Sequence, residues 1–334
     1  MKKIKVSLIA FCGTLLLSSC GGGVVKKEKK SDREEMGLVG KVESLRTVSE
    51  SGKGTLYVFN EAGNLLRKSS VEEGMDMDME EKLLAEYAYG DDGKLVSISH
   101  YSNMDGSLET KEVYDANGNM TALEKYNNTY GSEGRVSKLY STQHFVYDEK
   151  GLLVKSYMND NEGNATEYKC DAAGNILEQT DRFMGKVSRI LRFSYQYDNR
   201  GNITEECQYT PEIPGDKSPA TGKEKEKKVY KYDKNDFMLE QVQSSYTHDE
   251  KEHYLKQERV FKYTPDEHQN PVEVISSVYT YPEPQVKDGE KHYSEGIPVT
   301  MEYTYDAQGN WTDRKRVQGK QVTYDFRTIV YFEN

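Results

Sequence analysis

Residues 195–202 read Tyr-Gln-Tyr-Asp-Asn-Arg-Gly-Asn, and variants of this octapeptide recur along most of the 334-residue chain. The two tyrosines alternate with a polar residue, which is typical of a β-strand with one aromatic face. An Asp at the first turn position can accept a hydrogen bond from the backbone two residues on, and a Gly three positions later supplies a positive φ. Each copy therefore predicts a strand that ends in a tight hairpin turn.

The copies recur at an average spacing of about 31 residues, which is typical of a repeat architecture. They start at Phe59, Tyr89, Tyr114, Tyr147, Cys170, Tyr197 and Tyr305, with weaker copies at Tyr232 and Tyr263. Irregular turn signals, such as residues 104–106 and 159–163, lie between successive copies. The alternation of the two turn types predicts an all-β fold: a long antiparallel up-and-down meander of roughly 18 strands, as a single sheet that is curled open or barrel-like.

The composition agrees with such a sheet. Apolar residues make up 35% of the chain, a fraction that includes 26 Tyr, and charged residues make up 30%. This apolar fraction is low for a large hydrophobic core, so we expect β-structure that is exposed to solvent on at least one face.

The repeated Tyr-Asp-x-x-Gly-Asn, followed by an apolar residue, resembles the YD repeat of the RHS family from about Phe59 to Trp311. In large members of that family such strands wind a hollow shell, and some members cut themselves near a core motif that contains Asp-Pro. This chain has no Asp-Pro pair and is too short for a full shell, so neither self-cleavage nor toxin delivery is carried over. The resemblance implies a smaller bacterial envelope lipoprotein that carries only the repeats.

The first residues predict export and a lipid anchor. Residues 1–19 combine three lysines with an apolar run and small residues, which indicates a signal peptide. Leu17-Ser18-Ser19-Cys20 resembles the lipobox of bacterial lipoproteins and implies lipidation of Cys20, so the membrane is one expected partner. Residues 20–37 predict a flexible tether and residues 38–334 the repeat domain. By the same resemblance Gly21 implies the outer membrane, with the domain either periplasmic or surface-exposed.

Charge and motifs exclude several classes of function. Removal of the signal peptide removes three lysines and no acids, which takes the net charge from −11 to −14 and disfavours nucleic acid as a partner. The chain contains no nucleophile elbow, zinc-binding helix motif, phosphate-binding loop or dinucleotide fingerprint. We therefore expect no catalytic residue, no cofactor and no metal site. Cys170 and Cys207 would remain in the mature chain, either as a disulfide or as free thiols.

The tyrosine ladders have two interpretations. They form the core of the sheet by cross-strand packing, or some of them stack on a ligand. The candidate ligand-stacking residues are Tyr195, Tyr197, Tyr303, Tyr305 and Trp311.

The expected function is binding. We expect a non-catalytic lipoprotein of the outer membrane whose repeat body binds a glycan or a protein, with partner specificity in the irregular loops 211–228 and 282–289. One alternative is a periplasmic structural spacer or assembly scaffold without an external ligand. Another is a hydrolase with its site in the concavity of the sheet. The acidic charge favours a cationic or neutral partner over a polyanion.

Overall fold

The computed structural model describes residues 30–73, 79–131, 134–218, 220–248, 253–282 and 290–333, and these ranges form one antiparallel sheet with a short helix, α1 (Asp32–Glu35). The strands are β1 (Val42–Ser49), β2 (Lys53–Phe59), β3 (Leu65–Glu73), β4 (Met79–Tyr89), β5 (Leu95–Tyr101), β6 (Leu108–Tyr114), β7 (Met120–Gly131), β8 (Gly134–Tyr147), β9 (Leu153–Met158), β10 (Ala165–Cys170), β11 (Ile176–Phe183), β12 (Lys186–Tyr197), β13 (Ile203–Tyr209), β14 (Glu224–Tyr232), β15 (Met238–His248), β16 (His253–Pro265), β17 (Pro271–Thr280), β18 (His292–Glu295), β19 (Val299–Tyr305), β20 (Trp311–Gln318) and β21 (Gln321–Tyr331).

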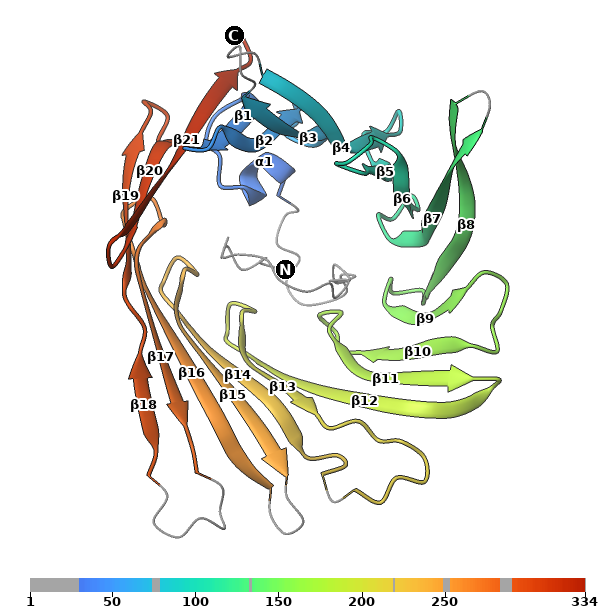
Figure 1. Cartoon of the computed structure of the whole chain (residues 1–334). Coiled ribbons are helices and arrows are strands. Elements are labelled where there is room, and N and C mark those ends of the chain that lie inside the picture. The colour runs from blue at the N-terminus through green and yellow to red at the C-terminus, as the bar shows by residue number, and fades with distance from the viewer. Residues whose placement is uncertain are drawn as a thin grey trace.

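The sheet closes on itself. Successive strands pair antiparallel, and β21 pairs with β1 from Val42–Tyr331 to Ser49–Asp325, so the strands form a ring (Figure 1). The expected 18 strands are present as nine hairpins, from β2–β3 to β19–β20, and β1 and β21 complete a 20-strand barrel. The short strand β18 pairs with the end of β17, while β19 pairs with its start. The all-β meander is thus confirmed, and of the two expected forms the closed barrel is the one adopted.

The motif turns have the predicted chemistry. At Asp198, Oδ1 accepts hydrogen bonds from the backbone N–H of Arg200 at 2.9 Å and of Asn202 at 2.8 Å, while Gly201 has a φ of 80°. The equivalent pair of bonds occurs at Asp115, Asp148, Asp171, Asp233, Asp266 and Asp306. This bonding holds the motif turns in one shape, so they define one regular end of the barrel.

We call this end the YD rim. It consists of residues 60–64, 90–94, 115–119, 148–152, 171–175, 198–202, 233–237, 266–270 and 306–310.

The repeat tyrosines lie on the inner face of the barrel. Tyr57 and Tyr87 pack against a buried cluster that includes Leu38, Leu45 and Phe59. Leu38 follows α1, and Figure 1 shows α1 inside the ring beside β1–β3. The face of the sheet that carries Tyr57 and Tyr87 is therefore the inner face.

The N-terminal segment is folded from Ser31 onward, although residues 20–37 were expected to form a tether. Ser31 and Glu34 form a reciprocal capping box for α1. Asp32 Oδ2 accepts a hydrogen bond from Leu65 N at 2.8 Å, and Arg33 N donates to the Gly63 carbonyl at 2.9 Å. These bonds to the first motif turn fix the segment on the YD rim. The predicted signal peptide and Cys20 lie outside the described residues.

Hydrogen bonds from repeat tyrosines link neighbouring hairpins. The hydroxyl of Tyr89 donates to the Leu65 carbonyl at 2.7 Å, and that of Tyr232 donates to the Ile203 carbonyl at 2.9 Å. Each acceptor follows the preceding motif turn, so the phenols connect one repeat to the one before it. In the Cys170 copy the thiol donates to the Leu153 carbonyl at 3.5 Å and so replaces the phenol.

Cys170 and Cys207 are both free thiols. Cys170 takes the place of a repeat tyrosine on the inner face, whereas Cys207 pairs with Ser194, which lies between the inner-facing Phe193 and Tyr195. The two thiols therefore point to opposite faces of the sheet, and the disulfide alternative is not realised. Among the described residues no helix is long and apolar enough to span a membrane.

Candidate binding surface at the variable rim

The end of the barrel opposite the YD rim is irregular, and we call it the variable rim. Its described parts are residues 50–52, 102–107, 159–164, 184–185, 210–218, 220–223, 281–282, 290–291, 296–298 and 319–320. The expected specificity loop 211–228 is described except for residue 219, and it continues into β14. Most of the loop 282–289 lies outside the described residues.

Large apolar side chains are exposed at the variable rim. Exposed fractions are 92% for Met104, 77% for Met184, 62% for Phe183 and 49% for Ile213. The corresponding exposed positions of the YD turns are polar or small, such as Asn117 and Ala307. Because large apolar side chains at such exposure mark interaction surfaces when they gather, the two rims differ in what they can bind.

Phe183 and Met184 lie at a turn that hydrogen bonds to the neighbouring connection hold in place. Met184 adopts a φ of 51°, which is unfavourable for a side chain with a Cβ. Its backbone N–H donates to Asn164 Oδ1 at 2.8 Å, and Gly185 N donates to the Gly163 carbonyl at 2.8 Å. The neighbouring β9–β10 connection therefore holds the strained turn while its two large side chains project into solvent.

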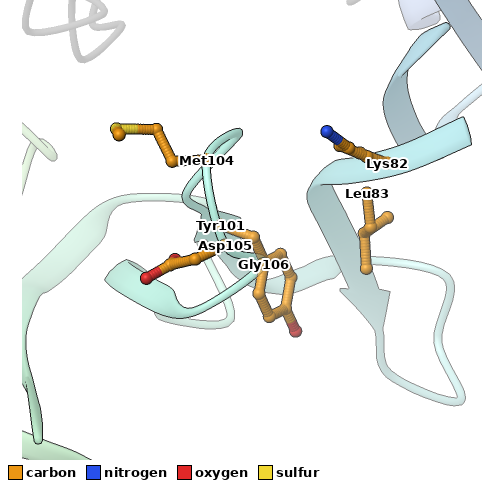
Figure 2. A pocket seen from close by; sticks show the side chains of 6 residues that line it. All are labelled: Lys82, Leu83, Tyr101, Met104, Asp105 and Gly106. Carbon is orange, nitrogen blue, oxygen red and sulfur yellow. The ribbon is translucent and has the colours of Figure 1, made fainter.

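A second feature of this rim is a pocket of about 430 Å³ beside the β5–β6 turn. Figure 2 shows Leu83 and Tyr101 extending side by side from neighbouring strands, with Lys82 above them and Met104 projecting from the turn. Asp105 shapes this turn, because its Oδ1 accepts hydrogen bonds from both the backbone N–H and the hydroxyl of Ser107. The pocket thus offers an apolar floor with one cationic and one anionic group at its edge.

Two of the tyrosines predicted to stack on a ligand bond to motif turns through their hydroxyl groups. Tyr197 donates to Asp171 and accepts from Asn175, and Tyr305 donates to Asp266 and accepts from Asn270 at 3.0 Å. Burial raises the phenol pKa of Tyr197, and the Asp171 carboxylate raises it further. These two hydroxyls are therefore engaged in holding the preceding motif turn.

The remaining predicted residues lie in the inner wall. Tyr195 and Tyr303 are half-buried, and Trp311 is 8% exposed. The Arg327 guanidinium carbon lies 3.5 Å from the centre of the Trp311 ring, and Tyr303 packs at 6.0 Å between ring centres. Trp311 and Tyr303 therefore belong to one aromatic group, while Tyr195 lies far from it on β12. Of the exposed residues, Met104 and Ile213 lie in the irregular connections 104–106 and 211–228 that the sequence indicated. The exposure of their apolar side chains was not predicted, because the repeat pattern describes the strands and not their irregular connections.

The fold and its two rims define a closed antiparallel β-barrel assembled from hairpins with Tyr-Asp turns. No protein-family model and no curated protein matches the chain. Among solved structures, the chain is similar to TcdB2-TccC3-TEV, with 13% identity and a TM-score of 0.33 over 84% of this chain. It spans 16% of the length of that chain.

Two porin-like proteins are also similar. The protein from Bacteroides uniformis has 10% identity and a TM-score of 0.30, with 87% of this chain and 98% of that chain covered. The protein from Bacteroides vulgatus has 9% identity and a TM-score of 0.27, with 88% and 99% covered. At these identities and TM-scores the likenesses carry no conclusion about what the chain binds.

Proposed function

We propose that the chain is a non-catalytic lipoprotein, anchored in the outer membrane through Cys20, whose variable rim binds a protein partner. The observation that carries the binding proposal is the exposure of Phe183 and Met184 on a turn that hydrogen bonds hold rigid. A rigid turn loses little conformational freedom on association, and Met and Phe are enriched where proteins meet.

The position of the N-terminal segment supports an orientation for this role. Ser31 and Arg33 lie against Gly63 on the YD rim. The chain between Cys20 and Ser31 spans at most about 40 Å when fully extended. A lipid on Cys20 would therefore hold the YD rim near the membrane and leave the variable rim directed away from it, where a partner can approach.

Photo-crosslinking in cells tests the binding surface. A photoreactive phenylalanine analogue replaces Phe183 in one variant and Ala116, an exposed YD-rim residue, in the matched control. We expect a discrete protein adduct from position 183 that is missing from position 116. No adduct at position 183, or the same adduct at both positions, contradicts a protein-binding variable rim and favours the spacer alternative.

Two further measurements test the anchor and the side of the membrane. Cys20→Ala is expected to move the protein from the membrane fraction to the soluble fraction, and retention in the membrane would contradict lipid anchoring at Cys20. Protease treatment of intact cells, with a periplasmic protein as control, then distinguishes the two leaflets. Loss of the domain while the control survives indicates surface exposure, and protection indicates a periplasmic partner.

A glycan is the second candidate ligand, because one exposed aromatic group at the variable rim suits sugar stacking. Tyr293 is 54% exposed and its ring lies 4.9 Å from that of Tyr279. The Lys291 ammonium lies 4.0 Å from the centre of the Tyr279 ring. A glycan ligand predicts that Tyr293→Ala abolishes binding on a glycan array, whereas the photo-crosslink at position 183 gives no protein adduct.

A further inference from the structure

Three arginines lie close together on the inner face of β20 and β21. Arg314 pairs across the strands with Asp325, and Arg316 pairs with Thr323. Arg327 is two residues from Ile329, which packs in the inner-face cluster around Leu45. This cationic stretch stands out because the chain as a whole carries a net charge of −11.

Only one of the three guanidinium groups has a carboxylate partner among the described residues. Arg314 donates to Asp325 Oδ2 from Nε at 3.0 Å and from Nη2 at 2.7 Å. Arg316 donates to the neutral Gln318 side chain at 3.2 Å. Arg327 makes no hydrogen bond or ion pair within the described part of the chain, and its buried Nε lacks an acceptor. The wall therefore holds more positive than negative charge at this point.

Trp311 forms the floor beneath these groups. The guanidinium carbons of Arg327 and Arg314 lie 3.5 and 5.2 Å from the centre of its ring. A cation–π contact of this kind stabilises a desolvated guanidinium, which offsets part of the cost of the missing acceptor. It neutralises no charge, so the two cations continue to repel each other.

The electrostatics of Arg327 agree with a group that lacks its counter-ion. Burial, together with the neighbouring Arg314, lowers the pKa of Arg327 to about 10. The residue remains partly exposed on the inner face, so a ligand inside the barrel can reach it. An anion at this place would relieve both the desolvation and the repulsion.

We propose that Arg327 and Arg314, above Trp311, bind an oxyanion group, carboxylate or phosphate, of a ligand that enters the barrel. Guanidinium groups suit this ligand class because their N–H donors match two oxygens of one carboxylate or phosphate. The site lies in the barrel wall and does not depend on partner binding at the variable rim.

Fluorescence tests the site directly, since Trp311 is the single tryptophan of the chain. The full-length protein is titrated with inorganic phosphate and, separately, with sodium glucuronate, at constant ionic strength set with sodium chloride. We expect a saturable change in tryptophan emission with at least one probe. A response to phosphate alone assigns the site to phosphoryl groups, and a response to glucuronate alone assigns it to sugar acids. A response to both probes assigns it to oxyanions in general.

Variants separate a binding site from a structural stack. Arg327→Gln is expected to weaken the apparent affinity about ten-fold or more, since bonds to charged groups contribute about 1.5–3 kcal/mol each. Arg67→Gln, on the outer face of β3, is the matched control and is expected to bind as the original chain does. If circular dichroism shows that Arg327→Gln does not fold, Arg327→Lys replaces it and is expected to weaken binding several-fold.

Two results would overturn the proposal. One is the absence of any saturable response to either probe, which would leave a purely structural cation–π stack. The other is equal affinity in the Arg327 variant and the Arg67 control. Both results are independent of the crosslinking at position 183, so this proposal and the proposed function can fail separately.

Discussion

The side-chain amide of Asn310 bonds to both backbone groups of Val39, which lies 271 residues earlier in the chain. Asn310 Oδ1 accepts from the Val39 N–H at 2.7 Å, and Nδ2 donates to the Val39 carbonyl at 2.8 Å and to the Tyr331 hydroxyl at 2.8 Å. Tyr331 in turn donates to Asp306. The last motif turn thus binds the entering chain and the final strand together, at the point where β1 and β21 close the barrel.

We therefore predict that Asn310→Ala is destabilising, because it removes a buried amide that bonds to both backbone groups of Val39 and to the Tyr331 hydroxyl. The free energy of unfolding is expected to fall by about 3 kcal/mol in a urea titration. Asn119→Ala is the control, since this residue occupies the same turn position but, among the described residues, its side chain bonds to Asp115 alone. A loss of about 1 kcal/mol is expected there. Equal losses of unfolding free energy in the two variants would argue against a special role of Asn310 in closing the barrel.

Nine hairpins could be predicted from the sequence because the Asp and Gly of most motif turns act locally. Closure could not be predicted, because it depends on β1 and β21, which lack the motif, and on contacts such as that between Val39 and Asn310. The curvature of the sheet also depends on the bulges beside each turn, as at Gln196–Tyr197. The N-terminal start of the folded chain does carry a sequence signal, because Ser31 and Glu34 form the Ser-x-x-Glu pattern of a capping box.

The two weak copies of the motif give a second prediction. Gln269 occupies the position of the motif glycine with a φ of 62°, and its buried Oε1 has no hydrogen-bond donor among the described residues. Gln269→Gly is expected to raise the free energy of unfolding by about 1 kcal/mol, because it removes both penalties. The reverse change, Gly201→Gln, is expected to lower it by a similar amount or more.

The other weak copy, the turn at 233–237, gives a comparison for Gln269→Gly in the same urea titration. Asp236 also has a positive φ, but it accepts a hydrogen bond from Asn202 at 2.7 Å and pairs with Arg200 at 3.0 Å. Asp236→Gly relieves strain and loses these bonds, so it is expected to be less favourable than Gln269→Gly. A destabilised Gln269→Gly variant would contradict the strain argument.

The inner-wall site could be predicted only in part. Trp311 follows the last motif turn, so the repeat register placed it in the slot of a buried apolar residue. Arg327 lies on β21, outside every copy of the motif, and its stacking on Trp311 follows from the pairing of β20 with β21. Sequence periodicity shows which residues share a face within a strand, but it does not give the register between β20 and β21, which no motif turn connects.

The thiols give a third prediction. Burial, together with the Glu224 carboxylate, raises the pKa of Cys207 to about 11. Because the thiolate is the reactive form, Cys207 is expected to react with iodoacetamide at pH 8 at least about ten-fold more slowly than a thiol with the ordinary pKa near 8.5. In denaturant without reductant, Cys170 and Cys207 are both expected to be modified completely. Mass spectrometry of tryptic peptides measures both, and a disulfide-linked peptide pair would contradict the free thiols.

The turn carboxylates predict how stability depends on pH. Burial raises the pKa of Asp198, but hydrogen bonds from Asn202 and Arg200 outweigh burial and hold the pKa below the ordinary value of 3.8. A folded-state pKa below the unfolded one stabilises the fold above the unfolded value. This contribution is lost as the pH falls through the folded value. The free energy of unfolding is therefore expected to drop below about pH 4.

Asp198→Asn tests the origin of this drop, because an amide keeps an oxygen acceptor for the turn but no longer titrates. The slope of unfolding free energy against pH below about pH 4 is expected to decrease in this variant. Asp91→Asn is the control, since Asp91 is exposed and makes no hydrogen bond within the described residues. Its slope is expected to match that of the original chain. If the slope of Asp198→Asn also matches, the acid sensitivity comes from groups other than this turn carboxylate.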